Sequence, residues 1–419
     1  MGLIIKNIKG LVQAELNPRK YAAGKGMSFL PVVENSWLFL NGIHIDSFGK
    51  MDEYSLDESN HETIDAKDRF VFPSYCDSHT HLVYAGSREI EYTDKIRGLS
   101  YEEIAGRGGG ILNSAKLLGA TSEDDLFEQS MVRVNEIIGM GTGAVEIKSG
   151  YGLTVESEIK MLRVIRRIGE SSPLEVKSTF LGAHSLPEEF RDNRGKYIDL
   201  VINEMIPAIT SEGLAEYIDV FCDKGFFTVE ETERILVAGL KHGLTPKIHA
   251  NELDFSGGIQ VGVNYGALSV DHLEFTGNEE INRLLESETM ATLLPGAALF
   301  LGLIDPPARM MIDAGLPIAL ASDYNPGSSP SGNMKLIMSL GCIKLKMLPE
   351  EVINAVTING AYAMGLADTH GSIARGKTAN LFITDKIPSF EFMPYAYGSD
   401  LVDMVILNGK VIERPKAKG

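Results

Sequence analysis

The chain has 419 residues, with 39 Lys and Arg against 57 Asp and Glu, which gives a formal net charge of −18 at pH 7. Hydrophobic residues make up 44% of it and charged residues 23%, as in ordinary globular proteins. The acidic balance argues against a nucleic-acid partner or an anionic membrane surface, because phosphate binding needs a basic face. With no signal peptide and no apolar stretch of the ~20 residues that a membrane span needs, the sequence predicts a soluble, cytoplasmic protein.

The two ends of the chain have similar β character. Residues 1–66 contain strand-like segments at 36–40 and 42–48, and Asn41-Gly42 between them is typical of a tight hairpin turn. Residues 369–419 repeat the pattern, with strand-like segments at 379–384, 404–407 and 410–412 and a second Asn-Gly pair at 408–409. We therefore expect one small β-sandwich domain built from both chain ends.

Residues 67–368 alternate apolar strand-like runs with amphipathic segments such as 156–168, 229–242 and 279–287. The runs show little polar alternation, which is typical of parallel strands buried on both faces. Eight such units predict an α/β fold, a (β/α)₈ TIM-like barrel inserted between the two ends. The expected barrel strands are 70–76, 143–147, 174–181, 217–222, 245–249, 267–270, 290–294 and 317–321.

The connection from residue 81 to 143 is long, and insertions at this end of a barrel strand commonly form substrate loops. Arg88 and Arg107 lie in it and are candidate clamps for an anionic substrate, since Arg holds a carboxylate by two parallel hydrogen bonds. A solvated surface position is the alternative for both. The glycine run at 108–110 lacks the spacing of a phosphate loop and is better explained as a flexible lid.

Five of the nine histidines follow or end an expected strand, which is where a barrel builds its active site. They are His79, His81, His184, His249 and His272. His79 and His81 are two residues apart, so on an extended segment both rings face the same side and can reach one metal ion. His249 and Asp323, at the ends of the fifth and eighth strands, complete a set of three imidazoles and a carboxylate. That set suits zinc or ferrous iron rather than magnesium or calcium.

Four side chains near these strand ends are candidates for chemistry or substrate contact. A bound ion would lower the pKa of water to about 7, and Asp323 can also accept that water's proton; a helix N-cap is its alternative. Glu252 can donate a proton to a leaving nitrogen, or it forms a salt bridge in a surface loop. His272 can polarise a carbonyl or orient the hydroxide, or it is a hydrogen-bonded core histidine. Tyr151, between two glycines, faces a pocket or belongs to a plain turn.

Phe72-Pro73, His79-Thr80-His81, His249, His272 and Asp323 together resemble the amidohydrolase superfamily of metal-dependent hydrolases. More specific stretches are similar to the cyclic amidases of that superfamily that open an imidazolone ring, and the likeness covers nearly the whole chain. These stretches are 78–83, 108–111, 146–152, 180–184, 271–274, 294–296 and 323–328.

The resemblance implies hydrolysis of 4-imidazolone-5-propanoate to N-formimidoyl-L-glutamate by metal-activated water, a step of histidine degradation. It implies one divalent ion, zinc or iron, and a homodimer that takes a small anionic substrate. The implied metal ligands are His79, His81, His249 and Asp323. The implied catalytic residues are Glu252, His272 and Asp323. The implied substrate-binding residues are Arg88, Tyr151, His184, Asn325, Gly327 and Ser328.

Two other functions stay open from the sequence. Another mononuclear amidohydrolase, such as a nucleobase deaminase, would use His249, Glu252 and Asp323 equally well, but a neutral base offers no carboxylate to Arg88. A non-catalytic barrel that serves as a binding or scaffold protein would be expected to lack metal ligands, and here all four are present.

Overall fold

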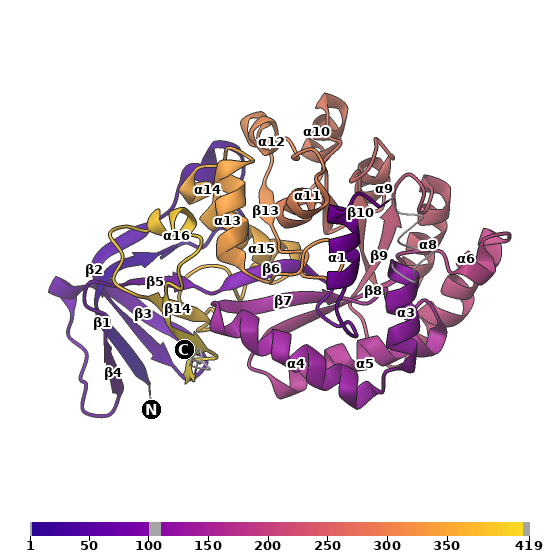
Figure 1. Cartoon of the computed structure of the whole chain (residues 1–419). Helices are drawn as coiled ribbons and strands as arrows, with labels where there is room; N and C mark the ends of the chain where they lie inside the picture. The colour runs from indigo at the N-terminus through magenta and orange to yellow at the C-terminus, as the bar shows by residue number, and fades with distance from the viewer. Residues whose placement is uncertain (1, 100–109, 414–419) are drawn as a thin grey trace.

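The computed structural model describes residues 2–99 and 110–413. Within this part of the chain, eight parallel strands form the barrel sheet, in the same order as in the sequence (Figure 1). They are β6 (Tyr75–Thr80), β7 (Thr142–Lys148), β8 (Glu175–Ala183), β9 (Tyr217–Cys222), β10 (Thr245–Ala250), β11 (Ser269–His272), β12 (Met290–Leu293) and β13 (Ile318–Leu320). The (β/α)₈ architecture expected from the sequence is thereby confirmed.

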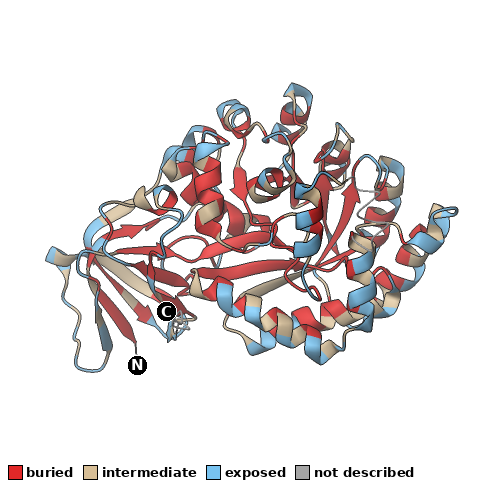
Figure 2. Cartoon of the chain, in the orientation of Figure 1, coloured by how far each residue is buried: buried red, intermediate tan, exposed pale blue. Residues whose placement is uncertain are grey.

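The barrel strands are almost entirely buried, and exposed residues lie on the outward faces of the surrounding helices (Figure 2). Good caps help these helices to form: α8 begins with a capping box between Thr228 and Glu231. The helices between β6 and β13 are α1 (Glu89–Ile96), α3 (Ile111–Ala120), α4 (Glu123–Gly139), α5 (Val155–Ser171), α6 (Arg194–Leu200), α7 (Ile206–Ser211), α8 (Val229–Lys241), α9 (Gly258–Asn264), α10 (Asn278–Leu285), α11 (Pro295–Leu301) and α12 (Ala308–Ala314). After β13 come α13 (Met334–Ile343), α14 (Pro349–Val356), α15 (Ile358–Ala363) and α16 (Phe392–Tyr395).

Both ends of the chain contribute to a second sheet beside the barrel (Figure 1). The expected β-sandwich takes the form of one continuous mixed sheet with its own apolar core, which includes Ile5, Leu38 and Ile406. The second Asn-Gly pair forms its hairpin turn as expected, and Asn408 and Gly409 have φ of 52° and 70°. In the first hairpin the turn lies one residue later than expected, at Gly42 and Ile43, and Asn41 ends β2 paired with His44. The strands are β1 (Leu3–Val12), β2 (Val32–Asn41), β3 (His44–Lys50), β4 (Glu62–Asp65), β5 (Phe70–Pro73), β14 (Leu381–Thr384), β15 (Val402–Leu407) and β16 (Lys410–Ile412).

The first expected barrel strand, 70–76, is wrong as a single element. The structure divides it into β5, which pairs with β1 and β14 of the small sheet, and β6, which enters the barrel. The chain changes sheets at Ser74, whose N–H donates to the carbonyl of Asn380, whereas the N–H of Tyr75 donates to Gly141. An apolar run does not reveal such a change, because both sheets bury their part of it.

The barrel closes between the ends of β6 and β13, just where the candidate metal ligands lie. The N–H of Asp323 donates to the carbonyl of His79, and the N–H of His81 donates to Tyr324, both at 3.0 Å. Beneath them Asp77 accepts from the backbone N–H of Ser322 at 2.9 Å and from its hydroxyl at 2.5 Å. These four bonds join the first and last strands and fix Asp323 beside the two histidines.

In the described ranges, no helix has the length and apolar composition needed to cross a bilayer.

Substitution of Asp77 by Ala should lower the free energy of unfolding by about 2 kcal/mol or more, because two buried donors of Ser322 lose their acceptor. Asp77→Asn retains a carbonyl oxygen in the same place and should cost much less. Urea unfolding of the two variants measures the difference. Equal stability of Asp77→Ala and the unsubstituted protein would show that this closure contributes nothing.

Candidate active site

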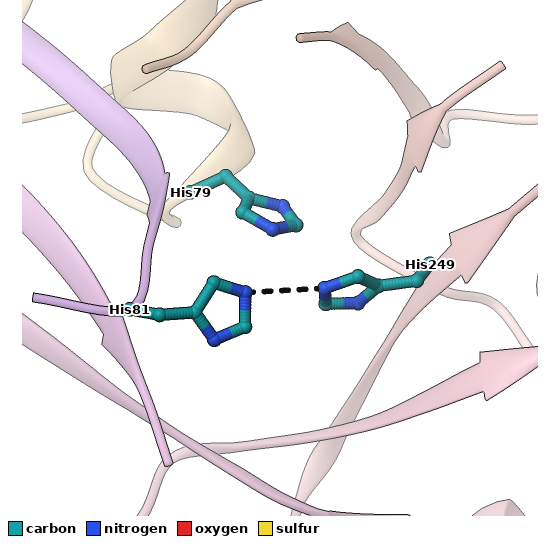
Figure 3. A group of neighbouring side chains, drawn as sticks. All are labelled: His79, His81 and His249. Atoms are coloured by element: carbon teal, nitrogen blue, oxygen red, sulfur yellow. Dashed lines mark hydrogen bonds between the residues drawn. The ribbon is translucent and has the colours of Figure 1, made fainter. Parts of the chain in front are cut away.

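Three histidines meet inside the carboxyl end of the barrel. His79 lies near the end of β6, His81 directly follows that strand, and His249 lies near the end of β10 (Figure 3). One nitrogen from each ring lies within 4.8 Å of the others, and Nε2 of His81 is 3.3 Å from Nε2 of His249. The three residues are at most 2% exposed. The sequence prediction that these rings converge is confirmed, and the cluster has the composition and spacing to hold a metal ion.

The protonation of these rings fits a cation. Burial holds the pKa of His79 and His81 well below the usual value of 6.5, so both rings are neutral at pH 7. In the described part of the chain, Nε2 of His79, which faces the cluster, is buried and has no hydrogen-bond partner. Neutral imidazoles with free lone pairs are the form in which histidine binds metal. The residues present therefore fit a transition-metal ion.

Asp323 lies beside the same cluster, after the end of β13. Its Oδ1 is 3.6 Å from Nε2 of both His79 and His81. Its backbone has φ of +52°, outside the helical region, and the next helix begins only at Met334 with Asn333 as its cap. The N-cap alternative for Asp323 is therefore wrong. Burial raises the pKa of Asp323 to about 7, so this carboxyl group titrates near neutral pH.

The outer nitrogens of two of the rings are held by buried carboxylates. Nδ1 of His79 is 2.7 Å from Oδ2 of Asp271, and Nδ1 of His249 is 2.9 Å from Oδ2 of Asp219. A carboxylate at this position fixes the tautomer and the ring orientation and makes the other nitrogen a better ligand. Both rings thus present Nε2 to the centre of the cluster.

His272 and Glu252 lie next to the cluster and face each other. Nε2 of His272 is 3.8 Å from Oε2 of Glu252, and its Nδ1 is 4.0 Å from Glu274. Burial opposes a charge on His272, but the surrounding carboxylates outweigh it and raise the pKa of this histidine to about 9. His272 is therefore not a hydrogen-bonded core histidine, and Glu252, 7% exposed, is not part of a surface salt bridge.

Tyr151 and His184 lie beside His81. The ring of His184 stacks on His81 with centroids 5.1 Å apart, and the ring of Tyr151 is 5.9 Å from His81. His184 is anchored through Nδ1 to the carbonyl of Gly150 at 3.1 Å, and burial lowers its pKa to about 3. Tyr151 is 3% exposed, so it belongs to the interior of the site and not to a plain turn.

The loop after β13 carries the remaining predicted residues. Oδ1 of Asn325 accepts from the N–H groups of Gly327 and Ser328 at 2.7 and 2.8 Å, and this turn is stabilised from within. The hydroxyl of Ser328 donates to Oδ2 of Asp323 at 3.3 Å. The loop therefore joins the proposed substrate residues to the proposed metal ligand.

Arg88 lies against this loop. A Cβ atom on Gly327 would clash with Nη1 of Arg88 unless that side chain moved, so the guanidinium lies directly against this glycine. Nε and Nη2 of Arg88 donate to Glu91 at 2.8 and 2.6 Å, and both groups line a cavity of about 280 Å³. Its side chain is 15% exposed, unlike a solvated surface arginine. Arg107 and the proposed lid glycines 108 and 109 lie outside the described residues.

Comparison with known proteins identifies the family. The profile of the amidohydrolase family matches residues 228–412. Imidazolonepropionase of Christiangramia forsetii is 54% identical over 412 residues, which cover 98% of this chain and 100% of that protein. Imidazolonepropionase of Geobacillus kaustophilus is 43% identical over 390 residues, 92% of each chain. The chain belongs to the imidazolonepropionase family.

Among solved structures, E. coli guanine deaminase has a TM-score of 0.75 at 12% identity and covers 99% of both chains. Triazine hydrolase from Arthobacter aurescens has a TM-score of 0.73 at 15% identity and covers 99% of this chain and 95% of its own. At such low identity these similarities show a shared fold and nothing of the reaction.

Sequence reasoning on this imidazolonepropionase-family chain missed the carboxylates behind the ligands. Asp219 and Glu146 each interrupt an apolar strand run, and Asp271 directly precedes His272. A charged residue inside a strand that is buried on both faces is the signal that would have found them, because such a group must be paired.

The protein should retain about one equivalent of transition metal after gentle purification, and His249→Ala should lose it, because one of the three converging imidazoles is gone. His184→Ala is the matched control: it removes a half-buried ring stacked on His81 that does not belong to the cluster. Elemental analysis of the purified proteins gives the result. Full metal content in His249→Ala would exclude the cluster as the binding site.

Proposed function

We propose that this site hydrolyses the ring amide of 4-imidazolone-5-propanoate to N-formimidoyl-L-glutamate in histidine degradation. Water adds across the ring C–N bond, so the carbonyl carbon becomes a carboxylate and the ring nitrogen takes a proton. The observation that carries the proposal is the meeting of a three-histidine cluster with the buried Glu252–His272 pair. The 54% identity to a curated imidazolonepropionase over nearly the whole chain supports the choice of substrate.

His79, His81, His249 and Asp323 would hold a single zinc or iron ion. The chemistry that such an ion supplies is Lewis acidity, which lowers the pKa of water to about 7. Asp323 is close enough to accept the proton of the attacking water, since its Oδ1 lies 3.6 Å from Nε2 of both His79 and His81. Its second oxygen, held by Ser328, keeps the carboxyl group in a fixed orientation.

His272 and Glu252 have two further roles, which are stabilisation of the carbonyl oxygen and protonation of the leaving nitrogen. A protonated His272 places positive charge near the substrate carbonyl and stabilises the oxygen as it becomes negative, which is commonly the largest single contribution to such a rate. Glu252, 3.8 Å from that ring, passes the proton released by the attacking water on to the ring nitrogen as the C–N bond breaks, so that the step neither gains nor loses a proton. Without that proton the nitrogen would leave as an anion, which is far less favourable.

The substrate's propionate group needs a cation in this acidic protein, and Arg88 provides one. With Nε and Nη2 bound to Glu91, its Nη1 is directed toward Gly327 of the loop after β13. Tyr151 and His184, beside His81, would hold the ring, and Asn325, Gly327 and Ser328 would contact it from the loop. A neutral nucleobase has no carboxylate to pair with Arg88, which disfavours deamination.

We further propose a cytoplasmic homodimer that takes a small anionic substrate and has neither a nucleic-acid nor a membrane partner. The net charge of −18 supports the absence of polyanionic partners. The dimer rests on the family resemblance.

The direct test measures the loss of imidazolone absorbance with fresh 4-imidazolone-5-propanoate, and ammonia release from guanine, cytosine and adenine in parallel. The proposal predicts turnover of the imidazolone and no ammonia. Ammonia from a nucleobase without imidazolone turnover would replace the proposed function by deamination, and no reaction with any of them would favour a scaffold.

Glu252→Gln should lower kcat by about 100-fold or more, because a side-chain amide is too weak an acid to protonate the leaving nitrogen. Asp254→Asn is the matched control, since Asp254 lies in the same loop, is exposed and pairs with Lys224 at 2.8 Å. Steady-state kinetics with imidazolone propanoate measure both. A kcat near that of the unsubstituted protein would remove Glu252 from the mechanism.

Arg88→Ala should raise KM by about tenfold or more with metal content unchanged, because a charge-assisted pair with the propionate is lost. Arg97→Ala, on the exposed end of the same segment, provides the control. The same assay with metal analysis separates binding from metal loss. An unchanged KM for Arg88→Ala would refute its role as the clamp.

A further inference from the structure

A cluster of five charged side chains lies within the barrel, behind the histidines. All five are 0% exposed and come from strands β7, β9, β10 and β11. They are Glu146, Lys148, Asp219, Lys247 and Asp271. Burial of charge costs several kcal/mol for each ion unless it is paired with good geometry. A cluster of this size is therefore expected to serve a purpose beyond stability.

Lys148 is the centre of the cluster. Its Nζ donates to Oε1 of Glu146 at 2.6 Å and to Oδ2 of Asp219 at 2.8 Å, and it lies 3.5 Å from Oδ2 of Asp271. The two aspartate oxygens are the same atoms that hold the metal-site rings: Oδ2 of Asp219 contacts His249, and Oδ2 of Asp271 contacts His79. One ammonium group thus touches both oxygens that orient two of the three imidazoles.

We propose that Lys148 is a positioning residue of the metal site, which holds Asp219 and Asp271 so that each accepts the Nδ1 proton of its histidine. Nε2 of both His79 and His249 is then fixed toward the centre with its lone pair free. The inference rests on the metal site of the proposed function and is independent of the identity of the substrate. It places the origin of ligand geometry on β7, a strand that itself supplies no metal ligand.

The ion pairs explain why a lysine is needed at this position. Asp219 and Asp271 are brought close to one another through a shared cation, and without it two buried carboxylates would repel each other. Rotation of either carboxylate away from its neighbour would break its bond to the histidine and turn the ring. Carboxylates and other groups directly behind metal ligands commonly contribute 10- to 100-fold to metal affinity.

Lys247 offers an internal comparison. It is equally buried and bonds to the other oxygen of Glu146, but its remaining bonds go to the carbonyls of Ser78 and Ala363 at 3.3 and 3.0 Å. Among the described contacts it reaches neither Asp219 nor Asp271. A substitution at Lys247 therefore tests the loss of a buried charge in the same cluster without the loss of ring positioning.

The experiment compares Lys148→Met with Lys247→Met. Each full-length protein is stripped with a chelator, and its Zn²⁺ affinity is measured by competition with a chromophoric chelator; urea unfolding of the metal-free protein gives its stability. Lys148→Met should bind Zn²⁺ about 10- to 100-fold more weakly, and Lys247→Met should stay within about threefold. An unchanged affinity in Lys148→Met, or an equal loss in both variants, would overturn the proposal.

If Lys148→Met does not fold, Lys148→Gln is used in its place, because glutamine keeps a hydrogen-bond donor at this position but carries no charge. Its effect is then measured alone, together with Asp271→Asn, and in the double variant. If Lys148 acts through Asp271, the fold-loss of Zn²⁺ affinity in the double variant should be smaller than the product of the fold-losses in the two single variants. A fold-loss equal to that product would show that the two residues act independently and would contradict the inference. Failure of the unsubstituted protein to bind Zn²⁺ would remove the metal site itself, which separates failure of the proposed function from failure of the role of Lys148.

Discussion

The pairing of buried charges with one another and with two of the imidazoles organises the interior of this barrel. Asp219 and Asp271 satisfy the outer nitrogens of His249 and His79, and Lys148 in turn satisfies both carboxylates. With those demands met from behind, the inner ring nitrogens are left facing a common centre. The site is thus defined from the strands outward: the pairing network fixes the rings, and the rings define where a cation fits.

The closure of the barrel adds Asp323, the fourth proposed metal ligand, to this arrangement. Asp323 lies more than two hundred residues from His79 in the chain, yet a backbone hydrogen bond places the two side by side where β13 meets β6. The proposed substrate-binding residues differ in origin, because Arg88 and the turn around Asn325 belong to loops that follow the strands. The barrel fold is shared with a protein named for another activity, so we expect the loops to contribute more than the strands to the choice of substrate.

The strand-end histidines could be predicted because period-two geometry and parallel strands leave little freedom: His79 and His81 must face one side, and His249 must reach the same edge. Other features depended on pairings between distant segments. The segment 70–76 is split into two strands because the N–H groups of Ser74 and Tyr75 bond to carbonyls of different sheets. The sequence pattern does not show which distant carbonyl each N–H group will reach. The contact of Lys148 with Asp219 and Asp271 likewise requires the five neighbouring strands β7 to β11 to be in register.

The central claim is that one cation is held by three converging imidazoles and Asp323. Crystals of the zinc-loaded protein, measured at wavelengths above and below the zinc absorption edge, test it most directly. The account predicts one anomalous peak within bonding distance of a nitrogen of His79, His81 and His249. A map with no peak among these rings, or with zinc bound only elsewhere on the protein, would contradict it.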